Sequence, residues 1–426
     1  MTSPDQLHLN VLLTGVGLHP GAARHTGDTS DTALSLAHYR ALTETAERGL
    51  FDAVFLADSP AVAPNASYDQ PIRVSPEPLT LLSALAATTS HIGLIGSAST
   101  SFYEPYNLAR LFSSLDHLSG GRAGWNAVTT SSPAAARNFG QAEQADHEDR
   151  YSRAEEFIEV VLKLWDSFEV GGTTATAVDH VGEIFSVAGP FDLPRTPQNR
   201  PVLAQAGSSP TGMRLGARYA DVIYTNQGSF QSSLAFRQQV RREAVAFGRD
   251  PDSVAVLPGV VPFLGSTESE AQRLKSELDE LVDLRSLLPS ALRWLGVDLT
   301  GYELEQPFPV DKLPEPESIR SSVGTYVQLA ETIRRDGLTV REALLRVGGG
   351  TIHRTFVGTP EQLADDFESW FKGGAVDGFN VMPAVVPGTL DDFVEFVVPI
   401  LQTRGLFRRR YESSTLSGHY RSAVAA

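Results

Sequence analysis

The sequence of 426 residues predicts a (β/α)8 barrel. Three observations indicate this fold: short apolar runs alternate with segments of helical periodicity, most of the runs are apolar throughout, and eight of them can be counted. Strands that are apolar on both faces are typical of parallel sheets covered by helices. Fewer strands would favour an open sheet, whereas eight favour closure into a barrel.

The expected elements follow one another along the whole chain. Strands are expected at 8–13, 52–58, 91–100, 123–130, 201–207, 221–225, 254–265 and 379–385. Helices are expected at 33–50, 78–89, 106–121, 149–168, 230–247 and 389–403. The helix at 149–168 has the most regular pattern, with apolar residues three and four positions apart. Another helix is expected to begin at Pro210, because proline is favoured in the first turn.

A long segment separates the seventh and eighth expected strands. It covers about 266–377 and contains helical pieces at 268–296 and 317–334 with a proline-rich stretch at 306–317. We interpret it as an insertion within a single barrel domain that spans residues 1–426. A C-terminal tail is expected from about 404 to 426.

Composition and charge exclude several classes of function. The formal net charge is −16, whereas binding to nucleic acid or to an anionic membrane needs a basic face. No cysteine is present, so disulfides, thiolate metal sites and a cysteine nucleophile are excluded. The N-terminus does not resemble a signal peptide, and no apolar run approaches the roughly 20 residues of a membrane helix. We therefore expect a cytoplasmic protein.

Common catalytic motifs are missing from the sequence. The stretch GVGLHPG at 15–21 has the wrong spacing for a dinucleotide-binding fingerprint, and there is no P-loop or HExxH motif. No G-x-S-x-G elbow is present, which disfavours a serine hydrolase. The ten histidines show no metal-ligand spacing, so we expect no metal site.

Small polar residues follow the expected strands instead. In (β/α)8 barrels ligands bind at the carboxyl ends of the strands. The residues at these ends are Asp58 after the second strand, Ser99 and Thr100 after the third, Asn126 and Thr129 after the fourth, and Ser208 and Ser209 after the fifth. We expect them to form a ring of hydrogen-bonding groups around one pocket. Asp58 could instead cap the next turn.

The run QAGSSPTG at 205–212 is a candidate phosphate site. It offers Gly207, two serine hydroxyls and the expected start of a helix at Pro210. Backbone N–H groups at a helix N-terminus, with hydroxyls beside them, can bind a phosphate without lysine. The alternative is that Ser209 is only the N-cap of that helix, for which serine is favoured anyway.

His147 and Tyr151 are candidate cofactor contacts. They are four residues apart at the start of the long helix, so both project from one face. The alternative is an exposed, charged helix start.

At this point the motifs resemble a known family. The segments are FDAVFLADS (51–59), EPLTLLSALA (77–86), 99–140, HEDRYSRAEEF (147–157), 182–212, VGTPEQLADDF (357–367) and RGLFRRRYESSTL (404–416). They are similar to FMN-dependent two-component monooxygenases of the bacterial luciferase-like superfamily. The branch resembled contains nitrilotriacetate monooxygenase, dibenzothiophene-sulfone monooxygenase and pristinamycin IIA synthase. The resemblance covers nearly the whole chain.

The resemblance implies that the barrel binds FMN in its reduced form, FMNH2. It implies that Asp58, Thr100 and Asn126 lie near the isoalloxazine ring and that Ser99 also contacts the cofactor. It implies further that His147 and Tyr151 reach the flavin or its phosphate, and that Ser209, with Ser208 beside it, holds the phosphate. His147 and Asn126 are the expected catalytic residues. The imidazole of His147 can donate or accept a proton near neutral pH.

The resemblance also implies a reaction and partners. A separate NAD(P)H:flavin reductase would supply FMNH2, and O2 would react with it to give a peroxyflavin that oxygenates a small or medium-sized organic substrate. We expect a homodimer or a homotetramer. Two alternatives remain open, namely a coenzyme F420-dependent oxidoreductase on the same barrel and a flavin-binding protein without turnover.

One departure from the family lies after the first strand. The family carries a Trp-Arg-His-Pro run there, whereas GLHPGAARHTGD (17–28) has Ala23 at the Trp position and Thr26 at the Pro position. The expected substrate pocket consists of His19, Ala23, His25 and Phe102. Either Phe102 or Tyr103 refills the space of the missing indole, or the space stays open for a bulky substrate.

Overall fold

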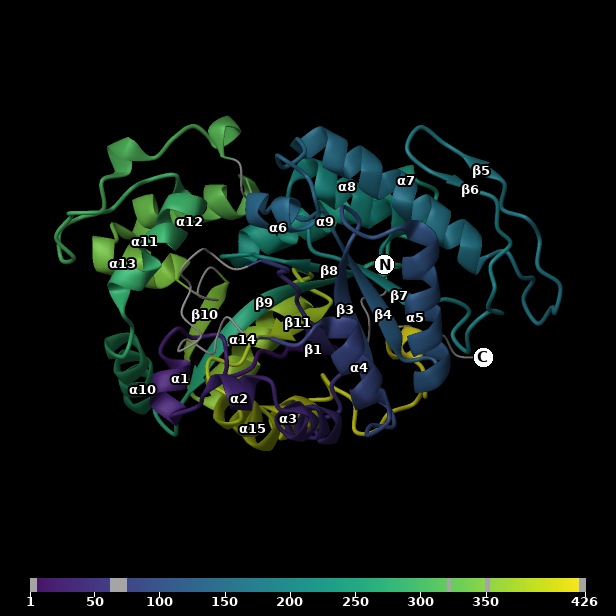
Figure 1. Ribbon diagram of the computed structural model, residues 1–426. Coiled ribbons are helices and arrows are strands. Elements are labelled where there is room, and N and C mark those ends of the chain that lie inside the picture. The colour runs from purple at the N-terminus through teal and green to yellow at the C-terminus, as the bar shows by residue number, and fades with distance from the viewer. Residues whose placement is uncertain (1–5, 62–74, 320–322, 349–352, 421–426) are drawn as a thin grey trace.

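Eight parallel strands close into a barrel, as the sequence predicts (Figure 1). The computed structural model describes residues 6–61, 75–319, 323–348 and 353–420. The barrel strands are β1 (His8–Leu12), β2 (Ala53–Leu56), β3 (Gly93–Ser99), β4 (Ala123–Val128), β7 (Val202–Gln205), β8 (Val222–Thr225), β9 (Ala255–Leu264) and β11 (Gly378–Val381). Closure occurs because β1 pairs with both β2 and β11, while β9 pairs with both β8 and β11.

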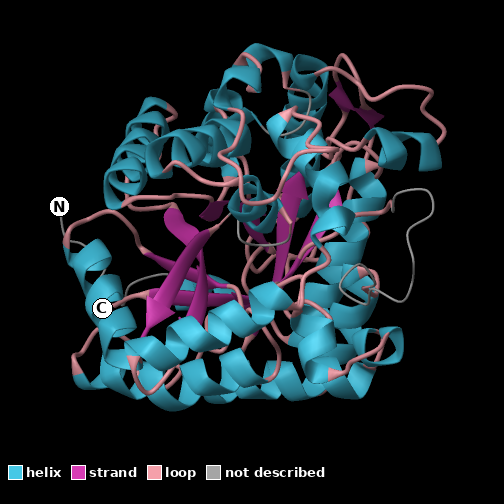
Figure 2. Cartoon of the chain, turned by 90° about the vertical axis from the view of Figure 1, so that its left-hand side faces the viewer, coloured by secondary structure: helices cyan, strands magenta, loops and turns pink. Residues whose placement is uncertain are grey.

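The strands are buried on both faces, which explains their continuous apolar runs. Alternate residues point into the barrel, where Leu12, Phe55, Ile95 and Leu257 belong to one apolar cluster. The residues between them point outward and pack against the helices. Figure 2 shows the strands enclosed by these helices.

The barrel helices agree with the predicted ones to within a few residues. They are α3 (Leu36–Arg48), α4 (Pro78–Ala86), α5 (Pro105–Ser119), α7 (His147–Trp165), α8 (Pro210–Tyr219), α9 (Phe230–Ala246) and α14 (Pro360–Lys372). The predicted helix at 389–403 consists of α15 (Gly388–Asp392), a π-helical turn η5 (Phe393–Val397) and α16 (Val398–Thr403). Five of these helices begin with proline in the first turn, which has no backbone N–H to leave unpaired. Short elements complete the chain around the barrel: α1 (Ala22–Thr26), α2 (Ser30–Ala33), α6 (Pro133–Asn138) and a small hairpin of β5 (His180–Val181) and β6 (Ser186–Val187).

The predicted insertion contains more than the expected helical pieces. Its helices are α10 (Glu268–Glu280), η2 (Leu284–Leu287), α11 (Leu288–Leu295), η3 (Val310–Lys312), η4 (Pro316–Ser318), α12 (Val323–Asp336) and α13 (Val340–Val347). Several of them share an apolar cluster of their own, beside the barrel on the left of Figure 1. The unexpected element is strand β10 (Arg354–Gly358), which pairs in parallel with the end of β9. The chain therefore returns to the barrel before α14, about 20 residues earlier than predicted.

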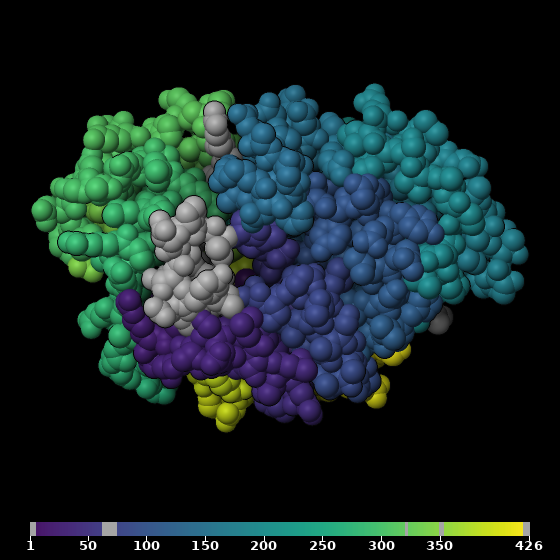
Figure 3. All heavy atoms as spheres, in the orientation of Figure 1, coloured from purple at the N-terminus to yellow at the C-terminus, as the bar shows by residue number. Residues whose placement is uncertain are grey.

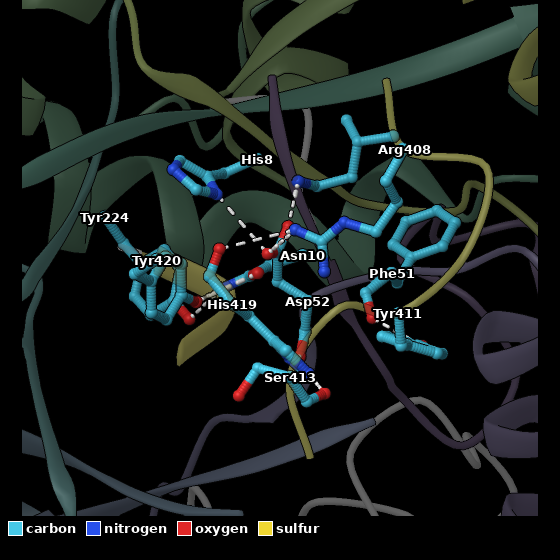
Figure 4. Close-up of polar contacts among 11 residues, drawn as sticks. His8, Asn10, Phe51, Asp52, Tyr224, Arg408, Tyr411, Ser413, His419 and Tyr420 are labelled. Atoms are coloured by element: carbon cyan, nitrogen blue, oxygen red, sulfur yellow. Dashed lines mark hydrogen bonds and ion pairs between the residues drawn. The ribbon is translucent and has the colours of Figure 1, made fainter. Parts of the chain in front are cut away.

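The C-terminal tail closes the amino end of the barrel (Figure 4). It ends in α17 (Leu416–Tyr420), and the Arg408 guanidinium forms an ion pair with Asp52, which is fully buried just before β2. Burial raises the pKa of Asp52, but Arg408 and His8 outweigh it and hold the pKa at about 2. Because this end is sealed by protein, the opposite end is the one available to a ligand. Residues 421–426 of the predicted tail lie outside the described residues.

Candidate functional site

A cavity of about 200 Å³ lies at the carboxyl ends of β4 and β7. It is lined by residues 127–131 at the end of β4, by His147, Arg150 and Tyr151 of α7, by residues 205–209 at the end of β7, and by Val323 of α12. The molecular surface is hollowed next to α6, which follows β4, in the view of Figure 3. Thus three predicted groups, after the fourth strand, on the long helix and after the fifth strand, come together at one place.

Two glycines shape the part of the cavity next to α8. A Cβ atom on Gly212 would lie 2.9 Å from the Gly207 Cα and 2.8 Å from the Tyr151 hydroxyl, and a Cβ on Gly207 would lie 3.1 Å from the same hydroxyl. Any side chain at either position would therefore collide with its surroundings. The absence of these side chains lets the loop after β7, the first turn of α8 and Tyr151 approach one another closely.

Ser209 is the N-cap of α8, and its hydroxyl accepts a hydrogen bond from the Gly212 N–H at 3.1 Å. Ser208 shares a hydrogen bond of 3.0 Å with Thr225, at the end of β8. The N-cap alternative is thus present in the geometry. It does not exclude a ligand, because a hydroxyl that accepts one hydrogen bond can still donate its own proton.

His147 and Tyr151 face the cavity from the first turns of α7. Their ring centroids are 4.6 Å apart, and both side chains are half-buried. Burial, together with the nearby Arg150 charge, lowers the pKa of His147 below its usual value, although Glu148 opposes this. The lowered pKa favours the uncharged imidazole, which is able to accept a proton.

Asn126 lies inside the barrel on β4 and is 2% exposed. Its Nδ2 donates to the Ser97 hydroxyl at 2.7 Å, while its Oδ1 is buried without a partner among the described residues. A buried acceptor without a donor costs about 1–3 kcal/mol. Such a group is typical of a site that is completed by a ligand or by water.

Ser99 is the last residue of β3, Thr100 follows it, and both are buried. The Ser99 hydroxyl accepts hydrogen bonds from the Ser101 N–H at 3.2 Å and from the Thr130 hydroxyl at 2.8 Å. Thr100 donates to the Val128 carbonyl at 3.2 Å. These contacts fix the end of β3 against the segment after β4.

Asp58 lies beyond the end of β2 and is half-buried. Burial raises the pKa of Asp58, and the neighbouring Glu77 carboxylate raises it further. The same two carboxylates, after burial, raise the pKa of Tyr103. Asp58 and Tyr103 therefore share an acidic environment that disfavours additional negative charge.

The four residues predicted for the substrate pocket have different surroundings. His19 is 1% exposed; its Nδ1 accepts from the Gly21 N–H at 3.1 Å, and its Nε2 lies 3.1 Å from Asp279 Oδ1 of α10. Both nitrogens are thus engaged in holding this loop on α10. Ala23 is half-buried on α1, and His25 on the same helix is exposed.

Phe102 stacks on Phe139 with ring centroids 4.4 Å apart, beside α6. Phe102 is therefore directed toward α6. The assignment of all four residues to a substrate pocket stays a prediction.

Sequence reasoning missed Arg150, Gln205 and the start of α12 as parts of the cavity wall. Arg150 is three residues after His147 and so lies on the same face of α7, which the helical spacing could have indicated. Gln205 is 5% exposed, and its Oε1 has no partner among the described residues. The position of Val323 depends on the insertion and has no local signal.

Comparisons with known proteins decide the family. The chain matches the luciferase-like monooxygenase family over residues 17–377. The chain belongs to this family. It is 43% identical to nitrilotriacetate monooxygenase component A of Aminobacter aminovorans, over 98% of this chain and 97% of that protein. The structure of EDTA monooxygenase from Chelativorans sp. BNC1 superposes with a TM-score of 0.80 at 36% identity, covering 97% of this chain and 98% of that chain.

A further solved structure, of riboflavin lyase with modified FMN and substrate riboflavin, superposes with a TM-score of 0.83 at 30% identity, over 96% of this chain and 94% of that chain. The predicted family and the branch that contains nitrilotriacetate monooxygenase are therefore confirmed. The protein is a flavin-dependent monooxygenase of the luciferase-like type. In the described part of the chain, no helix is long and apolar enough to cross a membrane, and no group of three or more side chains could hold a metal ion.

Proposed function

We propose that this protein is an FMNH2-dependent monooxygenase that receives its reduced flavin from a separate NAD(P)H:flavin reductase. The observation that carries the proposal is the cavity at the start of α8, which Ser208 and Ser209 line and where backbone N–H groups offer donors for a phosphate. Riboflavin shares the ring system of FMN but lacks this phosphate. A site shaped for a phosphate therefore favours FMN over riboflavin.

In this proposal, each group of residues has its own task. Ser208, Ser209 and the N–H groups of the first turn of α8 would hold the phosphate. Asn126, with its free Oδ1, would accept a hydrogen bond from the isoalloxazine ring, and Thr100 and Asp58 would border that ring. His147, whose lowered pKa favours the uncharged imidazole, would take up or return a proton beside the flavin.

The protein's contribution is binding, orientation and exclusion of water, because the flavin carries the redox chemistry. Reduced FMN supplies two electrons, so that one atom of O2 enters the substrate and the other leaves as water. The tail seals one end of the barrel, and α6 lies over the other end with its Asn138 side chain donating to the Pro60 carbonyl at 2.9 Å. Such enclosure limits the escape of reactive oxygen as peroxide.

The substrate is a small or medium-sized organic molecule that enters over the flavin. We place Ala23, His25 and Phe102 at its entrance and His19 behind it. We propose a cytoplasmic location, where NAD(P)H is available to the reductase, and a homodimer or homotetramer.

Anaerobic titration with FMNH2, followed by calorimetry, tests the proposal directly. We expect micromolar or tighter binding of FMNH2, weaker binding of oxidised FMN, and consumption of O2 once air is admitted. Absence of binding at saturating micromolar flavin would sink the proposal. Binding and hydride transfer with reduced F420, without O2 uptake, would instead support the oxidoreductase alternative, and FMN binding without any O2 chemistry would support a protein without turnover.

A further inference from the structure

Arg150 is a buried cation in the wall of the cavity. Its side chain is on α7, the residue is 6% exposed, and it lines the cavity together with Ser208 and Ser209. No carboxylate of the described residues lies within ion-pair distance of it. Burial lowers the pKa of Arg150, and Tyr151 and Asp146 only partly oppose this. A buried charge without a counter-ion is costly, so this position favours an anion.

Two other buried arginines differ from Arg150 in their protein partners. Arg237, 4% exposed, forms an ion pair with Asp377 at 2.5 Å. Arg122, 3% exposed, has no carboxylate partner, but all five of its N–H groups donate to protein oxygens at 2.8–3.1 Å. Each of these arginines is therefore satisfied by the protein alone.

Arg150 is only partly satisfied. Its Nε donates to the Ala145 carbonyl at 3.1 Å, and its Nη1 donates to the Thr129 and Thr130 carbonyls at 2.8 and 3.3 Å. Three of five N–H groups are thus engaged, and no described residue accepts from Nη2. Because a guanidinium is planar and rigid, fixing Nε and Nη1 also fixes the direction of Nη2.

The three accepted carbonyls lie at the two ends of one segment. Residues 129–145 leave the end of β4, form α6 and return to the start of α7. Gln144 reinforces the junction, since its Nε2 donates to the Thr130 carbonyl at 3.0 Å. Arg150 therefore clamps the base of the segment that covers the cavity.

We propose that Arg150 is a positioning residue that binds the FMN phosphate through Nη2 and, through Nε and Nη1, couples phosphate binding to closure of residues 129–145. The inference rests on the proposed FMN site. It assigns to one side chain both the counter-charge for the phosphate and the ordering of the segment over the flavin. Riboflavin, which lacks the phosphate, would occupy the ring site without engaging this clamp.

The test compares reduced FMN with reduced riboflavin, which differ in the phosphate alone. Arg150→Met keeps most of the side-chain length and removes the charge and all five donors. We expect its affinity for FMN to fall by about 10- to 100-fold, the range of a hydrogen bond to a charged group. The affinity for riboflavin should change by less than about threefold. Arg150→Lys keeps the charge without the fork, and it should lose FMN affinity to an intermediate degree.

Hydrogen exchange of residues 129–145 measures the coupling. In the wild-type protein, FMN should slow exchange in this segment more than riboflavin does, and in Arg150→Met the two ligands should be indistinguishable. Arg153→Met is the matched control, because Arg153 is on the same helix and donates to the Thr100 carbonyl at 3.0 Å but does not line the cavity. It should affect both flavins equally.

Equal loss of FMN and riboflavin in the Arg150 variants would overturn the inference, as would unchanged FMN binding. If Arg150→Met does not fold, Arg150→Lys is the variant that tests the inference. An Arg150→Lys protein that prefers FMN over riboflavin as strongly as the wild type does would contradict a role for the planar guanidinium. A wild-type protein that binds neither flavin contradicts the proposed function instead. Inorganic phosphate then tests Arg150 separately, because it should still slow exchange in residues 129–145 of the wild type and not of Arg150→Met.

Discussion

Replacing Ser209 by aspartate separates the structural role of this residue from its role in binding. Ser209 is the N-cap of α8, and its hydroxyl accepts from the Gly212 N–H at 3.1 Å. Aspartate is as good an N-cap as serine, and its charge is favourable at a helix N-terminus. The Ser209→Asp protein should therefore fold with a free energy of unfolding within about 1 kcal/mol of the wild type. Its carboxylate would nevertheless lie where the phosphate is proposed to bind.

The expected loss of affinity follows from the charges. A carboxylate and one phosphate charge about 4 Å apart repel by about 4 kcal/mol at an effective dielectric constant of about 20. A loss of that size corresponds to roughly a 1000-fold weaker Kd for FMN. Ser209→Ala provides the milder comparison: losing the cap should cost about 1 kcal/mol of stability, and losing a hydrogen bond to phosphate should cost about 1–2 kcal/mol of FMN binding.

Calorimetric titration with reduced FMN and reduced riboflavin, combined with urea unfolding, measures both quantities on the same preparations. Riboflavin should bind all three proteins with similar affinity. The reasoning is refuted if Ser209→Asp binds FMN as tightly as the wild type does. Equal losses for FMN and riboflavin in Ser209→Ala would show that the serine is a helix cap alone.

Three further changes have defined outcomes. Gly212→Ala places a Cβ 2.8 Å from the Tyr151 hydroxyl, so FMN affinity measured by calorimetry should fall at least tenfold while riboflavin binding falls less; equal losses would contradict the phosphate assignment. If the pocket is open, Ala23→Trp should reduce the turnover of a bulky native substrate more than it weakens FMNH2 binding. If neighbouring side chains refill the space, the same change should destabilise the fold by roughly 1–3 kcal/mol. A variant with unchanged turnover and unchanged stability contradicts both cases. The folded-state pKa of Asp52, about 2, lies below its ordinary value of 3.8, so the contribution of Asp52 to stability is present above about pH 4 and is lost as the pH falls toward 2. Arg408→Met removes a charge that lowers this pKa, so the midpoint of acid unfolding, followed by circular dichroism, should shift to higher pH. An unshifted midpoint contradicts the assignment.

The sequence predicts those parts of the structure that have local causes. Strands buried on both faces must be apolar throughout, so the number and order of the strands can be predicted from the sequence, and they imply the barrel. The position of Ser208 and Ser209 can also be predicted, because a serine before Pro210 indicates the start of a helix. A helix that starts after a barrel strand begins at the end of the barrel where ligands bind. The bounds of β7 and α8 agree with that interpretation.

Parts with non-local causes are not predictable in this way. Strand β10 is half-buried with a mixed pattern, and it becomes a strand because the end of β9 extends beyond its barrel neighbours. His19 is held by Asp279, 260 residues away. The pairing of Asp52 with Arg408 spans 356 residues and depends on the path of the tail. Arg150 on a charged helix start suggests exposure, and only the fold of residues 129–145 buries it.

Buried polar groups at the two ends of the barrel have different surroundings. At the closed end, the Asn10 Nδ2 donates to the hydroxyls of Tyr224 and Tyr420 at 2.6 Å each, and the Tyr420 hydroxyl donates back to Asn10 Oδ1 at 3.0 Å. At the open end, Asn126 Oδ1 is buried without a described partner, and two N–H groups of Arg150 have no described acceptor. Because an unpaired polar group costs free energy, a ligand that donates to Asn126 and accepts from Arg150 would stabilise this end of the barrel. An acceptor deep in the barrel and a cation beside Ser209 match the two ends of a molecule that carries a hydrogen-bonding ring and a phosphate, as FMN does.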